Sequence, residues 1–248
     1  MNTHVLSATL KDNAKGRLIG HYGLLIGSQL TIGCITLVAS FILSNMIVTP
    51  IAQNAGSLFL SMAFTYAVSL LVGTFTGVLQ VGLSLIYLKF ACGNTNAHFS
   101  DIFYGYQNGL QTALGISFIA AVVGILPSLF SDIFYNIYVL TGVEMYWIIS
   151  SFGELVIQIF CVFISLFLFP CYYLMLDFPG KSTKEILRLC LEVMKGHKGK
   201  LFYITLSFLP LELLGIVSII GGLWIAPYVN MTNALFFFEI MKKEDVVK

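Results

Sequence analysis

The feature that most constrains this chain is its division into long apolar runs joined by short connections, with the cations confined to alternate connections. The most cationic connection, STKEILRLCLEVMKGHKGK at 182–200, separates two runs that water would not solvate. Charged residues make up 10% of the 248 residues, whereas soluble domains carry about 25%. So few charges cannot cover a globule with polar surface, and we therefore predict a single, mostly lipid-embedded domain.

Six apolar runs are each long enough to cross a hydrocarbon core, which takes about 20 helical residues. We predict an all-α polytopic membrane protein with six transmembrane helices and short interfacial amphipathic helices. The predicted spans are 21–47, 58–91, 110–130, 146–176, 201–220 and 223–241. We expect the aromatic stretch 131–147 to lie flat in the outer interface and Gly221-Gly222 to form a tight outer turn.

The second run, 58–91, is longer than a straight crossing needs. The helix there either projects beyond the membrane or bends near one of its glycines, Gly73, Gly77 and Gly82. The predicted organisation is an N-terminal segment at 1–19, a transmembrane domain at 20–241 and a tail at 242–248.

Two segments outside the spans have amphipathic patterns. Leu6, Leu10 and Ala14 share one helical face among cations, which indicates either a surface helix or a solvated lead-in. Ser182 and Glu185 have the spacing of a capping box, which predicts that a second helix begins there. This second helix is expected over 182–196, with an apolar stripe of Ile186, Leu187, Cys190, Val193 and Met194.

The distribution of cations predicts the orientation. All 13 Lys and Arg residues fall in the N-terminal segment, the second connection, the fourth connection or the tail. By the positive-inside rule, connections rich in Lys and Arg stay on the cytoplasmic side of a membrane. Both termini are therefore predicted to be cytoplasmic. The expected location is the plasma membrane.

The fourth connection carries a basic surface, which we define as Arg188, Lys195, His197, Lys198 and Lys200. These residues either act only as orientation signals or bind anionic lipid headgroups or a membrane-protein or peptide partner. The formal net charge of the whole chain is only +1, so nothing favours a nucleic-acid partner.

Sequence motifs of soluble enzymes are missing: there is no P-loop, H-E-x-x-H, G-x-S-x-G or dinucleotide fingerprint. The four histidines are scattered and the five cysteines form no C-x-x-C, so we expect no cofactor, no metal and no catalytic residue. We interpret the cysteines as small apolar side chains.

Charged groups inside a membrane are costly and are usually functional. Glu154 and Glu212 are the two carboxylates within predicted spans, and helical rise places both in the outer half of the membrane with Asn230. With Gln158 they are expected to form a polar pocket that shares a proton or holds a cation. The alternative is that each carboxyl group only makes hydrogen bonds that pack the helices.

The last third of the chain also carries a family resemblance. Its signature residues are Pro170, Tyr172, Met175, Asp177, Pro179, Lys184–Glu185, Glu192–Lys198, Leu201–Phe202, Leu206–Phe208, Trp224, Pro227–Tyr228 and Asn233–Phe237. In this order they resemble the bacterial membrane family called domain of unknown function 975. The chain departs from the family pattern at SFLPLELL, which places Pro210 and Glu212 in an apolar run. The resemblance implies a multi-pass bacterial membrane protein and supplies no reaction.

Three functions remain open from the sequence. The first is a non-enzymatic protein that works through a partner, in peptide export, bacteriocin sensitivity or immunity, or envelope maintenance. The second is a small proton- or cation-coupled transporter that uses the Glu154 and Glu212 pocket. The third is a lipid-acting enzyme, which would need Asp101, Asp177 and the histidines to converge near the headgroups.

Overall fold

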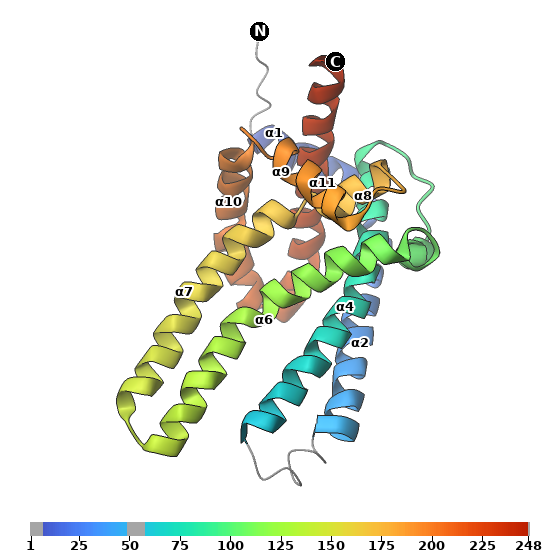
Figure 1. The fold of residues 1–248 in the computed structure, drawn as a ribbon. Coiled ribbons are helices and arrows are strands. Elements are labelled where there is room, and N and C mark those ends of the chain that lie inside the picture. The colour runs from blue at the N-terminus through green and yellow to red at the C-terminus, as the bar shows by residue number, and fades with distance from the viewer. Residues whose placement is uncertain (1–6, 49–57, 248) are drawn as a thin grey trace.

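The structure is a computed structural model that describes residues 7–48 and 58–247, and these residues form helices with no strand among them. The helices are α1 (Ser7–Leu18), α2 (Tyr22–Leu43), η1 (Ser44–Val48), α4 (Leu58–Ala91), η2 (Phe99–Phe103), α5 (Tyr104–Gln107), α6 (Leu110–Thr141), α7 (Glu144–Leu168), α8 (Cys171–Asp177), α9 (Thr183–Val193), α10 (Lys198–Val217) and α11 (Ile219–Val247). In Figure 1, α1, α9, the start of α10 and the end of α11 gather at one end of the bundle, which we call the cationic end.

Four candidate membrane spans are present among the described residues: Tyr22–Met46, Phe59–Ala91, Leu110–Thr141 and Glu144–Asp177. The all-helical fold is therefore as predicted, and these four helices are long and apolar enough to cross a membrane. The fifth and sixth predicted spans correspond to α10 and α11, which are not among these four, so six crossings are not confirmed.

Helix α4 lies at the centre of the bundle and packs against α2, α6, α8, α11 and η2. It is one unbroken helix, and its glycines allow close approach of its neighbours. A Cβ added at Gly77 would lie 2.7 Å from the Cβ of Ser117 on α6, and one added at Gly82 would collide with the carbonyl oxygen of Ile102 in η2. These glycines therefore serve packing against α6 and η2.

Helices α6 and α7 form a long antiparallel hairpin (Figure 1). The prediction of a flat loop at 131–147 is wrong, because α6 continues to Thr141 and turns at Gly142, which has a φ of 70°. Ser150 on α7 donates to the carbonyl oxygen of Ser131 at 3.0 Å, and the Phe130 ring of α6 packs directly on Gly153. Serine, aspartate and asparagine in this stretch suggested a loop, but their side chains are accommodated within helix–helix contacts.

The turn between α10 and α11 also differs from the prediction. It lies at Ser218, whose hydroxyl accepts a hydrogen bond from the N–H of Gly221 at 3.2 Å and so caps the start of α11. Gly221 and Gly222 are inside α11, where Gly222 packs closely on Gly215 of α10. In Figure 1 this turn lies near the middle of the bundle, whereas α6 and α7 meet at the far end.

Helix α1 packs across the α10–α11 hairpin at the cationic end. Leu10, Ala14 and Leu18 are buried, so the predicted face is confirmed for Leu10 and Ala14, while Leu6 lies outside the described residues. The Lys11 ammonium donates to the carbonyl oxygen of Ser207 at 3.3 Å and lies 4.1 Å from the centre of the Phe208 ring. Burial, together with the charge of Lys15, lowers the pKa of Lys11.

The predicted capping box of α9 is confirmed. The N–H of Ser182 donates to Glu185 Oε2 at 2.8 Å, and the N–H of Glu185 donates to Ser182 Oγ at 3.4 Å. Four residues of the predicted stripe are buried and Leu187 is half-buried, so this face packs against the bundle. The buried members are Ile186, Cys190, Val193 and Met194.

Candidate functional site

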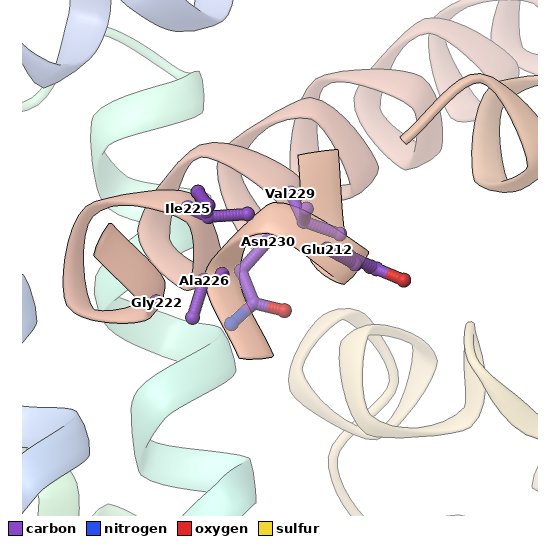
Figure 2. Close-up of a pocket in the computed structure, with 7 residues that line it drawn as sticks. Glu212, Gly222, Ile225, Ala226, Val229 and Asn230 are labelled. Atoms are coloured by element: carbon purple, nitrogen blue, oxygen red, sulfur yellow. The ribbon is translucent and has the colours of Figure 1, made fainter. Parts of the chain in front are cut away.

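Glu212 and Asn230 line one pocket of about 370 Å³ between α10 and α11. Gly215 and Gly222 form part of its wall, close to the turn of the hairpin. Figure 2 shows the Glu212 carboxylate directed away from the Asn230 amide, so the two side chains share a pocket without facing each other. Of the four residues of the predicted polar pocket, the structure brings these two together.

Gln158 lines a different cavity of about 250 Å³, where α6, α7, α10 and α11 meet. The two cavities are neighbours, because Val229 contributes to both. Thr205 and Asn233 add polar groups, and the Thr205 hydroxyl donates to the carbonyl oxygen of Leu201 at 3.1 Å. We call this space the α7–α10 cavity; its lining includes Gln158, Cys161, Ser165, Leu201, Thr205 and Asn233.

Glu154 lines neither cavity. The Tyr66 hydroxyl donates to Asp132 Oδ2 at 2.7 Å. Asp132 is ten residues before Gly142, and Glu154 is ten residues after Glu144. Both therefore lie about 15 Å from the end of the α6–α7 hairpin. Sequence reasoning missed the Tyr66–Asp132 pair because it placed Asp132 in a loop.

The five residues of the basic surface have different environments. Lys200 pairs with Glu239 of α11 at 3.0 Å, and both side chains are largely buried. Arg188 pairs with Glu192 at 3.4 Å on the exposed face of α9. The Lys198 ammonium lies 4.4 Å from the centre of the Phe167 ring at the end of α7. His197 Nδ1 is 3.3 Å from the carbonyl oxygen of Val193, and Lys195 is exposed.

The described carboxylate and histidine residues suggested for a lipid-acting enzyme do not form a metal site, and His4 lies outside the described residues. Asp101 accepts from Lys89 at 2.6 Å and from the N–H of His98 at 2.9 Å, so its carboxylate is held in a structural contact. Across residues 7–48 and 58–247, no three His, Cys, Asp or Glu residues are arranged to hold a metal ion. The five cysteines carry free thiols, and those of Cys161, Cys171 and Cys190 are buried.

Comparison with known proteins gives a family. The model of the family described as "Protein of unknown function (DUF975)" matches residues 5–244. The chain belongs to this family. No curated protein and no solved structure matches the chain.

The DUF975 match has a structural consequence. It extends from α1 to the last turns of α11, so it includes the short helices as well as the four candidate spans. The α10–α11 hairpin and the α1 helix that packs on it therefore belong to the family unit, as do both cavities.

Proposed function

We propose that this DUF975 protein is a multi-pass protein of the bacterial plasma membrane that works by binding a partner within the membrane, without catalysis. Such a protein takes part in peptide export, in bacteriocin sensitivity or immunity, or in envelope maintenance. The cationic end lies on the cytoplasmic side with both termini, because α1, α9 and the end of α11 carry most of the cations.

The depth of the α10–α11 hairpin is the observation that supports partner binding. Lys15 of α1 lies over Tyr228 of α11 at 5.7 Å, and Phe208 of α10 meets the same ring at 5.0 Å. Ser218 is ten residues from each ring, so the turn lies about 15 Å beyond the level of the two rings that the lysines of α1 reach. Helix α2, which begins near that level, is 22 residues or about 33 Å long.

The hairpin is therefore best explained as re-entrant: it enters from the cytoplasmic side and returns. A turn at this depth is tolerated only where protein or water satisfies its backbone, and the pocket of Glu212 and Asn230 lies beside it. Because the hairpin is short, the outer part of α7 has α6 as its main neighbour. Phe152, Leu155 and Phe160 on α7 are each at least 60% exposed, which leaves room for a helix of a partner.

Cysteine labelling tests the topology. In a variant without native cysteines, single cysteines are introduced as Thr141→Cys, Lys195→Cys and Ser218→Cys and exposed to an impermeant maleimide in intact cells. We expect Thr141→Cys to react from outside and Lys195→Cys to react only after permeabilisation. Ser218→Cys should resist outside labelling, whereas six crossings would make it as reactive as Thr141→Cys.

Photo-crosslinking tests the partner. A photoreactive residue at Phe160 on α7 should give a defined protein adduct in cells, and the same residue at Phe41 on α2, which is similarly exposed, is the matched control. Adducts at Phe160 that contain lipid alone would contradict a partner on α7. Equal protein adducts at both positions would indicate collisions in the membrane.

A small transporter is the second candidate, because Glu212 and Asn230 line a pocket at the turn of the hairpin. A carboxylate at this depth is costly unless it is protonated or paired. Proton or cation flux in liposomes that carry the wild type, but not Glu212→Gln, would favour this function. Equal flux for the two proteins would exclude a role for Glu212.

A further inference from the structure

The α7–α10 cavity has a lining that combines apolar and polar groups. Cys161 and Leu201 provide apolar contact, and the amides of Gln158 and Asn233 lie among them. Within the part of the chain that the structure describes, neither amide has a side-chain hydrogen bond. Asn233 is half-buried and Gln158 is exposed at the cavity, so a ligand with hydrogen-bonding atoms and an apolar body would suit this cavity.

Cations lie at the inner mouth of the cavity. Lys198 is one helical turn before Leu201 on α10, and its ammonium lies over Phe167, next to the lining residue Leu166. Lys195 is exposed on the turn that precedes α10, while Lys200 is already paired with Glu239. Among the described residues Lys195 and Lys198 have no ion-pair partner, so their charges provide a site for an anion beside an apolar opening.

The volume of the cavity restricts the occupant. At about 250 Å³ it is smaller than the roughly 300–1,000 Å³ of a pocket that encloses a whole small molecule. Only a segment of a ligand fits inside, and the rest must lie along the outside of the bundle. A lipid meets this requirement, because one acyl chain enters the cavity and the headgroup stays at the membrane surface.

We propose that the α7–α10 cavity binds one anionic phospholipid of the cytoplasmic leaflet. Its phosphate lies against Lys198 and Lys195, its ester groups meet the Asn233 amide, and one acyl chain extends past Thr205 towards Gln158. This inference deepens the proposed function and rests on it, since the orientation puts the cationic end at the inner headgroups. The bound lipid fills the seam between the α6–α7 hairpin and the re-entrant hairpin.

Native mass spectrometry of the purified protein tests the site. After exchange into mixed micelles that contain equal amounts of phosphatidylglycerol and phosphatidylcholine, we expect one phosphatidylglycerol molecule to be retained per protein. Lys198→Gln should weaken retention about fivefold, the effect of one cation near an anionic headgroup. Lys184→Gln, which removes an exposed cation from α9 away from the cavity, is the matched control and should retain the lipid.

A substitution that fills the cavity separates this site from general attraction to anionic lipid. Thr205→Phe should abolish retention while the cations remain, and Ser165→Leu on the opposite wall provides the same test if Thr205→Phe does not yield a monodisperse protein. Equal retention of both lipids, or full retention by the filled variant, would overturn the proposal. Displacement of the lipid by millimolar inorganic phosphate would also overturn it, because a simple anion site would then suffice. Micelles have no inner or outer side, so lipid retention does not depend on the topology of the protein. A loss of retention is therefore distinct from a negative result in the labelling experiment.

Discussion

The ion pair between Lys89 and Asp101 ties the end of α4 to η2, and its removal should have a measurable cost. The two charged atoms are 2.6 Å apart, and the side chains are only 24% and 18% exposed. The same carboxylate accepts from the N–H of His98. We predict that Asp101→Asn destabilises the protein, because it leaves the Lys89 ammonium partly buried without an anion.

The burial of the pair sets the magnitude. Breaking a fully buried pair costs about 3–5 kcal/mol, while an exposed pair contributes about 0.2–1 kcal/mol. With about a fifth of each side chain exposed, we expect a loss of about 2 kcal/mol. For a chain of this size that corresponds to a fall in melting temperature of about 4–8 °C. Thermal unfolding in detergent, followed by tryptophan fluorescence, measures the shift.

Glu192→Gln is the matched control, because Arg188 and Glu192 are 84% and 51% exposed. It should change stability by less than about 0.5 kcal/mol. If Asp101→Asn lowers the melting temperature no more than Glu192→Gln does, the pair contributes nothing and the reasoning from burial fails. A double-mutant cycle with Lys89→Met then separates the pair energy from the hydrogen bond of His98.

The pH dependence gives an independent measure of the same carboxylate. Burial acts to raise the pKa of Asp101, but the hydrogen bonds from Lys89 and from the N–H of His98 outweigh it, and the pKa is lowered from its usual value. A carboxyl group with a lowered pKa in the folded state stabilises the protein above its unfolded pKa of about 3.9. The stability difference between wild type and Asp101→Asn should therefore be constant from about pH 5 to pH 8 and shrink below about pH 4. A difference that grows on acidification would contradict this assignment.

Three further predictions concern a close helix contact, a helix cap and a buried hydrogen bond. Gly82→Ala should cost about 1–3 kcal/mol by displacing η2 from α4, whereas Gly33→Ala, whose Cβ meets nothing within 4 Å, should be neutral or stabilising in the same unfolding assay. Ser182→Ala should cost about 1 kcal/mol through loss of the α9 cap, seen as faster hydrogen exchange at the start of α9. Tyr66→Phe should lower stability by about 1 kcal/mol, because it leaves Asp132 without its hydrogen bond, and an unchanged melting temperature would show that water replaces the hydroxyl.

The sequence predicted those features that depend on local patterns. The start and the buried face of α9 followed from Ser182, Glu185 and an apolar stripe, because a cap and its helix are a few residues apart. The Tyr66–Asp132 contact could not be predicted in this way, since it joins residues 66 positions apart on helices whose packing was unknown. Asp132 without this partner resembles a loop residue, which explains why α6 was expected to end too early.

The depth of the α10–α11 hairpin was hidden for a different physical reason. Hydropathy reports how many apolar residues follow one another, and a re-entrant hairpin has the same apolar residues on both sides of its turn as two crossing helices. The cue lies in α1, whose Lys11 and Lys15 contact Phe208 and Tyr228 half-way along the hairpin. In the proposed topology α1 lies at the membrane surface and limits how far the turn can descend, but its contact with the hairpin forms only in the folded chain.

The residues that stabilise this protein and the residues exposed for binding a partner lie in different parts of the fold. The largest buried side chains, among them Tyr87, Phe208 and Phe236, belong to the segments that meet at the cationic end, where α1, α4, α8 and α11 form the core. Phe152 and Phe160 on α7 contribute little to that core because they are mostly exposed. Substitution of exposed α7 residues should thus alter binding of a partner without lowering the melting temperature. Substitution of buried residues at the cationic end should lower both the melting temperature and partner binding.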